Sequence, residues 1–483
     1  YKMKYRNFIR EFRDLIWTRE VIEQMIDDLA ERIREFAMAD RDRWRGAPAE
    51  AGYQDFGSLE AKVRDMKRFA FVGWSGSTGP AVPAGGRAAH LDRLAAAEGE
   101  DQKIPETPQV TYVGPPLFPI DALRFRASEF SDPQGDPFGA MRWRVGEITP
   151  PGTPFNPKVP RKYEYPAVWE KEYGYYKKEV TIPKTVVRPG GMYRVRLRFK
   201  DSTGRWSHWS EPVQFVAGQP LEPIPELEGL RITEIMYHPK DDYALEYVEV
   251  ANVGSRTVDL TEVTLRGSIS FSFGLGTVGR LEGGSYVLVV RNRAVFNHYY
   301  GVLPAPIAGE FEGELPDEGG CVQLFWGSAH MIHDIRYDPE WYTETAGQGR
   351  SLVIRDEHTP LADWPKRTAW RPSYNEGGSP GKQDPELNGG IQLPGDVNQD
   401  GVLTVSDAVR LMRILLEGSA KLPCGKGTPE EESNRILYDL NGDSTVDLSD
   451  SIYLLSFLFL NGPEPVRGLQ WVYVIDCPDA VSD

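Results

Sequence analysis

The residues of this chain whose types and spacing could do chemistry lie near its C-terminal end, in a loop from residue 396 to residue 407. Oxygen-bearing groups occupy positions 1, 3, 5, 7 and 12 of this loop, and Gly401 provides the sharp turn at position 6. Carboxylate, amide and backbone carbonyl oxygens in this order are the ligands that surround Ca²⁺ in proteins. The predicted ligands are Asp396, Asn398, Asp400, Val402 through its backbone carbonyl, and Asp407.

A second loop, from residue 439 to residue 450, repeats the pattern about 43 residues later. Ser444 stands where the first loop has glycine, which we expect to weaken the turn without removing a ligand. Two matched loops predict a module that binds two Ca²⁺ ions. The predicted ligands of the second ion are Asp439, Asn441, Asp443, Thr445 through its backbone carbonyl, and Asp450.

Both loops end in Asp, and the sequence in front of each shows no pattern of an entering helix. Each is followed by a helical pattern, "SDAVRLMRILLEG" in the first case and "SDSIYLLSFLFLNGPEP" in the second. In these respects residues 394–483 resemble the dockerin type I family, and the second helical pattern resembles dockerin-like repeats of secreted planctomycete proteins. The resemblance implies docking onto a protein partner: a cohesin-like domain, another copy of this chain, or one of its own domains.

We expect the exiting helices, 407–417 and 450–460, to pack antiparallel and to leave Phe457 and Phe459 on a docking surface. Because no entering helix is expected, we predict that the loops are permanent clamps and not sensors. A disulfide between Cys424 and Cys477 is expected to staple this small module, with Cys321 free. The predicted helix contacts are Val409, Met412, Leu416, Ile452, Leu455 and Leu458.

The N-terminal end of the chain has a different pattern. Residues 1–73 carry helical periodicity, and "YRNFIREF" and "FGSLEAKVRDMKRFAF" resemble the C-terminal tail of the CotH kinase-like family. The ligands of such a kinase would lie upstream of Tyr1, so the resemblance implies no catalytic residue in this region. The chain begins without Met, and we expect it to be a piece of a longer polypeptide. Residues 74–107 are rich in Gly, Ala and Pro and are predicted to be a linker.

Residues 108–218 alternate polar and apolar side chains, which predicts strands. "MYRVRLRF" and "RWSHWSEP" resemble the fibronectin type III family. Because alternate residues of a strand share one face, we predict a cation–π ladder. Its members are Arg194, Arg196, Arg198, Trp206 and Trp209. The alternative, a glycan-binding aromatic surface, would consist of Tyr163, Tyr165, Trp169, Tyr173, Tyr175 and Tyr176.

After a proline-rich linker at 219–228, residues 229–384 show a second run of short strands. "ITEIMYHP", "EYVEVANVGSRTVDLTEVTL" and "GGSPGKQD" resemble the lamin-tail domain, an immunoglobulin-like binding and assembly module without known chemistry. His330 and His333 are expected on opposite faces of a strand, which argues against a shared metal ion. Residues 385–393 are predicted to link this region to the calcium module.

Length and composition restrict the possible functions. A chain of 483 residues needs several cores, and the fold class predicted is multidomain and mainly β, with a small N-terminal helical region, two immunoglobulin-like sandwiches and a C-terminal helical calcium module. The net charge of −16 argues against a nucleic-acid partner. No stretch approaches the roughly 20 apolar residues of a membrane span.

The sequence therefore favours a non-catalytic extracellular or cell-surface protein that docks or self-assembles, as a homo-oligomer or filament, through its calcium module. No motif of a known catalytic site was found in the chain. Two alternatives stay open: the accessory tail of a secreted CotH-like protein kinase, and a glycan-binding cell-surface protein.

Overall fold

The computed structural model describes residues 1–44, 58–73, 84–385, 389–418, 420–478 and 480. The chain divides into two compact units, residues 1–223 and 224–483, which are described separately. The resemblances to CotH, fibronectin type III and lamin-tail domains, and the domain boundaries drawn from them, stay predictions.

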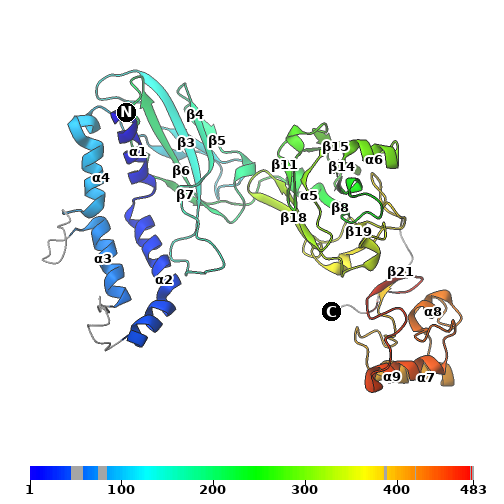
Figure 1. Ribbon diagram of the computed structural model, residues 1–483. Helices are drawn as coiled ribbons and strands as arrows, with labels where there is room; N and C mark the ends of the chain where they lie inside the picture. Colours follow the sequence, from blue (N-terminus) through cyan, green and yellow to red (C-terminus); the bar gives the residue numbers. More distant parts are fainter. Residues whose placement is uncertain (45–57, 74–83, 386–388, 419, 479, 481–483) are drawn as a thin grey trace. The chain divides into compact units, whose positions relative to one another are not determined.

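The first unit begins with helices in two columns, in which α4 runs beside α1 and α3 beside α2 (Figure 1). The predicted linker at 74–107 is wrong for residues 86–102, which form α4 and a 3-10 turn. The alanines of this segment favour helix and are small enough to pack closely, and Ala88 and Ala95 are buried. The helices are α1 (Lys2–Leu15), α2 (Arg19–Trp44), α3 (Leu59–Phe71) and α4 (Gly86–Ala96).

Two antiparallel sheets follow in the same unit. One has the strand order β1-β2-β5 and the other β4-β3-β6-β7. Strands β3 and β6 pair along most of their length, and Trp143, Tyr193, Leu197 and Phe199 on them are fully buried. The strands are β1 (Val110–Tyr112), β2 (Arg124–Ala127), β3 (Phe138–Ile148), β4 (Ala167–Tyr173), β5 (Glu179–Thr181), β6 (Met192–Asp201) and β7 (Val213–Val216).

A ladder of arginine and tryptophan side chains lies on the β3–β6 face. The Arg198 guanidinium lies 4.4 Å from the ring centroid of Trp206 and 4.5 Å from that of Trp209. Arg142 on β3 adds a contact of 4.9 Å with Trp206, and Arg144 one of 5.4 Å with Trp209. The local sequence pattern gives no sign of these two arginines, because only the register of β3 with β6 brings them to this face.

Arg194 and Arg196, which were predicted to belong to the ladder, bind carboxylates instead. Both guanidiniums pair with Glu164, whose side chain is buried, and Arg194 also contacts Glu20 of α2 at 2.7 Å. Two buried cations need an anionic partner, and Glu164 supplies it from within the same unit.

Helix α1 covers this face, so the ladder is an internal contact. Arg10 donates to the Trp206 carbonyl at 3.2 Å, and the Trp209 amide donates to Asp14 at 2.9 Å. Glu11 accepts from Arg198 at 3.2 Å. The helical region and the first pair of sheets therefore share one interior.

The aromatic residues considered for glycan binding are partly engaged in this packing. The Tyr163 hydroxyl donates to Asp28 of α2 at 3.2 Å, and that of Tyr176 donates to the Ser128 carbonyl at 3.0 Å. Tyr165 is half exposed.

The second unit opens with two further sheets, of order β15-β14-β9-β8-β19-β20 and β16-β12-β11-β17-β18, while β10 pairs with β13. Its helices are α5 (Pro225–Gly229) and α6 (Arg293–Tyr300). Its strands are β8 (Leu230–Met236), β9 (Tyr247–Asn252), β10 (Val258–Asp259), β11 (Val263–Gly267), β12 (Ile269–Ser272), β13 (Arg280–Leu281), β14 (Ser285–Val290), β15 (Ile307–Glu310), β16 (Glu312–Gly313), β17 (Gly320–Trp326), β18 (His330–Tyr337), β19 (Leu352–Ile354) and β20 (Trp370–Pro372).

The prediction that His330 and His333 face opposite sides of their strand is wrong. A register shift in the β17–β18 pair inserts one residue between them, and both side chains are buried. Each ring packs against an indole, His330 against Trp326 and His333 against Trp364. Burial, with a smaller effect from the Arg231 charge, lowers the pKa of His333 to about 3.

Two glutamates are buried directly opposite each other on β8 and β9. Glu234 accepts from the Tyr247 hydroxyl at 2.7 Å and from the Ser379 amide at 2.8 Å. Glu249 accepts from the Thr233 hydroxyl at 2.7 Å. Burial raises the pKa of both carboxyls, that of Glu234 to about 7.

The C-terminal part of the second unit combines a two-stranded sheet with three helices. Strand β21 (Gly389–Gln392) pairs antiparallel with β22 (Val472–Ile475), and α7 (Val405–Glu417) packs beside α9 (Leu448–Leu460) (Figure 1). Helix α8 (Glu432–Tyr438) lies between them in sequence.

Candidate metal centre

The first loop gathers its carboxylates around one point. One oxygen each from Asp396, Asp400 and Asp407 lies within 4.8 Å of the others, and Asp396 and Asp407 are fully buried. The loop backbone orients them: the Gly401 amide donates to Asp396 Oδ2 at 2.7 Å. Burial raises the pKa of Asp396, which a nearby cation would offset.

Other predicted ligands of the first loop are held by their neighbours. The Asn398 side-chain amide donates to Asp400 Oδ2 at 2.8 Å, and the Val402 amide donates to Asp400 Oδ1 at 3.0 Å. Gly401 has a φ of 81°, the left-handed conformation that a sharp turn at position 6 requires. An all-oxygen set of this geometry fits Ca²⁺.

The second loop reproduces these hydrogen bonds residue by residue, but of the two loops only the first brings three carboxylate oxygens within 4.8 Å of one another. The Ser444 amide donates to Asp439 Oδ2 at 2.9 Å, the Asn441 side chain to Asp443 Oδ2 at 2.9 Å, and the Thr445 amide to Asp443 Oδ1 at 2.9 Å. Ser444 adopts the left-handed conformation with a φ of 74°. The serine therefore keeps the turn of the first loop at the expense of backbone strain.

The aspartate at position 12 has a second task in each loop, because it also starts the following helix. Asp407 accepts from the Thr404 amide at 2.8 Å and Asp450 from the Asp447 amide at 2.9 Å, which completes a capping box at the start of α7 and of α9. The same carboxylates accept amides from the start of their loops, such as Leu440 to Asp450 at 2.7 Å. Loop closure and helix initiation are thus coupled.

The prediction that neither loop has an entering helix is wrong for the second loop. Helix α8 ends at Tyr438, directly before the loop, whereas β21 precedes the first loop. Leu437 and Tyr438 of α8 are fully buried in the core of the module. The sequence signal for α8 is weak because the helix has only seven residues.

The predicted contacts between α7 and α9 are partly wrong. Met412, Leu455 and Leu458 pack at this interface as expected, but Val409, Leu416 and Ile452 are exposed. The buried positions are instead Ala408, Leu411 and Ile414 on α7 and Leu454 on α9. Periodicity locates an apolar stripe, but the position of α8 and the loops decides which edge of the stripe is covered.

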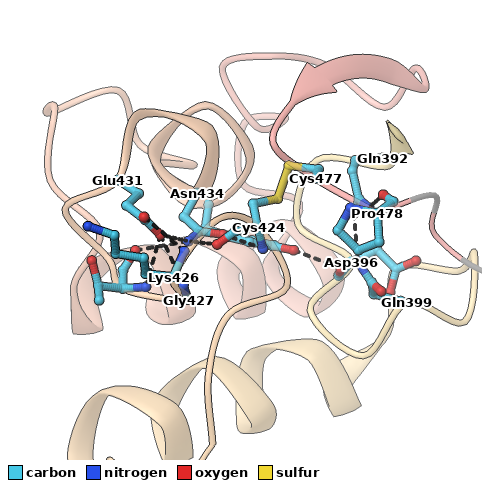
Figure 2. The surroundings of a disulfide bond; sticks show 12 residues. Gln392, Asp396, Gln399, Cys424, Lys426, Gly427, Glu431, Asn434, Cys477 and Pro478 are labelled. Atoms are coloured by element: carbon cyan, nitrogen blue, oxygen red, sulfur yellow. Dashed lines mark hydrogen bonds between the residues drawn. A yellow bond between two sulfur atoms is a disulfide. The ribbon is translucent and has the colours of Figure 1, made fainter. Parts of the chain in front are cut away.

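The structure joins Cys424 and Cys477 in a disulfide, with Cα atoms 4.1 Å apart, while Cys321 is free (Figure 2). Both bonded cysteines are buried in the module core. Asn434 of α8 holds Cys424 on both sides, because its side chain donates to the Cys424 carbonyl at 3.0 Å and accepts from its amide at 3.2 Å. The sequence carries no signal for this role of Asn434.

Two side chains close the module further, as Figure 2 shows. Gln399 of the first loop donates to the Gln392 side chain on β21 at 2.9 Å, and Gln392 donates to the Pro478 carbonyl. The first calcium loop is therefore tied to the chain that follows the second cysteine.

Apolar side chains remain exposed on the two helices. Of the predicted docking residues, Phe459 is 67% exposed, whereas Phe457 is half-buried against the small core between α7 and α9. The exposed apolar residues of these helices are Val405, Val409, Leu416, Leu448, Ile452, Phe459 and Leu460.

Comparisons with known proteins agree with this geometry. Residues 394–458 match the profile of the dockerin type I domain. The C-terminal module is therefore a dockerin type I domain, a class that binds calcium, docks onto a cohesin-like protein partner and is typical of extracellular or cell-surface proteins.

Comparisons of the whole chain add less. No curated protein matches the sequence. Two solved structures are similar over part of the chain: a DUF4876 family protein from Bacteroides thetaiotaomicron VPI-5482, with 10% identity over 46% of this chain and 84% of that chain at a TM-score of 0.21, and red sea bream transglutaminase, with 8% identity over 49% and 31% at a TM-score of 0.16. None of the described helices combines the length and apolar character that crossing a membrane requires.

Proposed function

We propose that this protein is a non-catalytic extracellular structural or adhesive protein whose dockerin module, clamped by two Ca²⁺ ions, docks the chain onto a cohesin-like domain. The observation that carries the proposal is the repeated loop geometry, in which Asp407 and Asp450 each close a loop and start a helix that presents apolar side chains.

A clamp is favoured over a sensor by what precedes each loop. A sensor opens when its entering helix swings away from its exiting helix. Here β21 precedes the first loop, and it is paired with β22. Helix α8 precedes the second loop, and Asn434 hydrogen-bonds it to disulfide-linked Cys424. Neither element is free to swing, so calcium is expected to control folding.

A protein partner is favoured by the exposed apolar surface of α7 and α9. Ile452, Phe459 and Leu460 are each more than 60% exposed on one helix. Exposed apolar side chains that cluster on a small module usually mark an interaction site. We favour a cohesin-like domain as the occupant because it is the partner of the dockerin class.

The test is a calcium-dependent binding titration of the full chain with cohesin-like domains encoded in the same genome, followed by calorimetry. We expect binding in calcium, its loss in a chelator, and at least tenfold weaker binding for the Ile452→Ala/Phe459→Ala variant. The matched control is Leu275→Ala, which removes an apolar side chain that is 91% exposed and lies outside the module.

Binding that survives chelation, or that is unchanged in the double variant, would contradict the proposal. Sedimentation of the chain alone addresses the other occupants. Calcium-dependent dimers or filaments would replace the cohesin-like partner with another copy of this chain.

A further inference from the structure

We infer that the first unit holds a calcium site of its own, formed by Asp132, Asp136 and Asp201. One carboxylate oxygen from each lies within 4.8 Å of the others. Asp132 and Asp136 lie in the segment between β2 and β3, and Asp201 is the last residue of β6. Nothing in the dockerin module contributes to this cluster.

Two carboxylate oxygens of this cluster are buried and have no hydrogen-bond donor among the described residues. Asp201 is 1% exposed, and its Oδ1 accepts from the Thr203 amide at 2.8 Å, the Thr203 hydroxyl at 2.7 Å and the Arg205 amide at 3.0 Å. Its Oδ2 is buried and finds no donor in the described part of the chain. A buried carboxylate oxygen in this position is costly unless a cation contacts it.

Asp132 shows the same division between its two oxygens. Its Oδ1 accepts from the Gln134 amide at 2.8 Å and from the Asp136 amide at 3.2 Å. Its Oδ2 is buried and has no donor among the described residues. The backbone thus satisfies one oxygen of each aspartate and leaves the other for a ligand.

Arg205, the first arginine after Asp201 in the sequence, does not hydrogen-bond with these two oxygens. Its guanidinium donates to Glu100 at 3.0 Å and to the Thr203 hydroxyl at 2.7 Å. Three carboxylates that converge without a hydrogen-bonded cation leave an excess of negative charge.

Calcium fits this cluster better than zinc or copper does. All available ligands are oxygens, which excludes a preference for zinc or copper. Calcium accepts oxygens at about 2.3–2.6 Å, so opposite ligands lie up to about 5 Å apart, which is compatible with the 4.8 Å limit. Water would complete the coordination shell.

The site would fasten the segment before β3 to the end of β6. The two are already joined where the Ser202 amide donates to the Pro137 carbonyl at 2.8 Å. An ion shared by Asp136 and Asp201 would strengthen this junction, which lies where β3 begins and β6 ends. Both strands belong to the sheet that carries the arginine–tryptophan ladder.

The experiment compares calcium stoichiometry between full-length variants by equilibrium dialysis. Asp136→Asn is the decisive variant because no hydrogen bond among the described residues ends on the Asp136 carboxylate. Asp201→Asn is the second variant, since asparagine keeps the Oδ1 acceptor. Glu129→Gln is the matched control: it removes one negative charge from a side chain that is 75% exposed, close to Asp132 in sequence.

We expect Asp136→Asn and Asp201→Asn each to bind one calcium ion fewer than the parent, and Glu129→Gln to bind the same number. The difference of one is independent of how many ions the dockerin loops take up. Equal stoichiometry in the parent and a folded Asp136→Asn variant would overturn the inference. Circular dichroism establishes folding, and if Asp201→Asn does not fold, Asp136→Asn decides alone.

Discussion

The dockerin module and the β-sheet region before it both bury carboxylates, but they neutralise them differently. In the module, Asp396, Asp407 and Asp450 lie at loop ends, fully buried, and accept several backbone amides. In the sheet region, Glu234 and Glu249 face each other across neighbouring strands. The aspartates of the first loop converge on a point that an ion can occupy, whereas the sheet glutamates are enclosed by side chains.

The two regions show how the backbone decides whether a cation or a proton neutralises a buried carboxylate. A loop can point several amides and carbonyls at one centre, and a divalent cation then satisfies the remaining oxygens. A strand pair offers no such centre, so burial raises the pKa of Glu234 and Glu249 and a proton is retained. Cation removal and pH should therefore affect the two regions separately.

Calcium chelation should produce the largest contrast. Without the ions, the carboxylates of each loop repel one another, and α7 and α9 lose the loop closure that starts them. Hydrogen exchange of the full chain should show α7 and α9 unprotected in chelator, while β8 and β9 stay protected. Equal protection of all four elements in chelator would contradict the expectation that only the module depends on calcium.

Loss of the disulfide should have the next largest effect, again confined to the module. The bridge spans 53 residues, and a loop of this length corresponds to about 4 kcal/mol of stability. The Cys424→Ser/Cys477→Ser variant should therefore unfold at lower denaturant concentration in calcium. Cys321→Ser is the control, and a similar loss of stability in both variants would contradict the assignment.

The folding stability of the sheet region should depend on pH through its two buried glutamates. A raised carboxyl pKa means that the folded state binds a proton more tightly, so stability is greatest at low pH and falls as the pH rises from about 4.5 through about 7. Glu234→Gln should remove on the order of 1–3 kcal/mol of this dependence. Protection of β8 and β9 would be measured at both ends of the range.

The matched control for this pH experiment is Glu312→Gln on the exposed strand β16. It should leave the pH dependence unchanged. A Glu234→Gln variant that is less stable than the parent at high pH would show that hydrogen bonds of the carboxylate, such as that to the Ser379 amide, outweigh its burial.

The smallest effect is expected within the module, between its two loops. Ser444→Gly should relieve the left-handed strain at φ 74° and stabilise the calcium-bound module by about 0.5–1 kcal/mol. The reverse exchange, Gly401→Ser, should cost a similar amount, since a Cβ there meets only Trp471 at 3.6 Å. Thermal unfolding in calcium would measure both, and effects of equal sign would contradict the argument.

Part of this architecture could be predicted from the sequence because the interactions are local. The calcium loops follow from residues at most eleven positions apart, such as Asp396 and Asp407, and the aspartate that closes each loop is followed directly by its helix. The alternation around "MYRVRLRF" likewise predicts a strand with Arg198 beside Trp206, because the chain returns after a short turn and Trp206 pairs with Lys200 in an isolated bridge.

Other features depend on segments that are distant in sequence. Arg142 and Arg144 join the ladder only through the register of β3 with β6. Arg194 and Arg196 form ion pairs with Glu164 and so do not belong to the ladder. Helices α4 and α8 are short, and each is stabilised by burial against neighbours that a local pattern does not show.

The sequence by itself determined the spacing of the calcium ligands, the helices that follow them and the alternation of the strands, because each depends on a few neighbouring residues. Only the tertiary structure decided which side of α7 is buried, and that Asp201 lies beside Asp132 and Asp136. The physical reason is that burial and charge depend on what surrounds a side chain, and distant segments supply those surroundings.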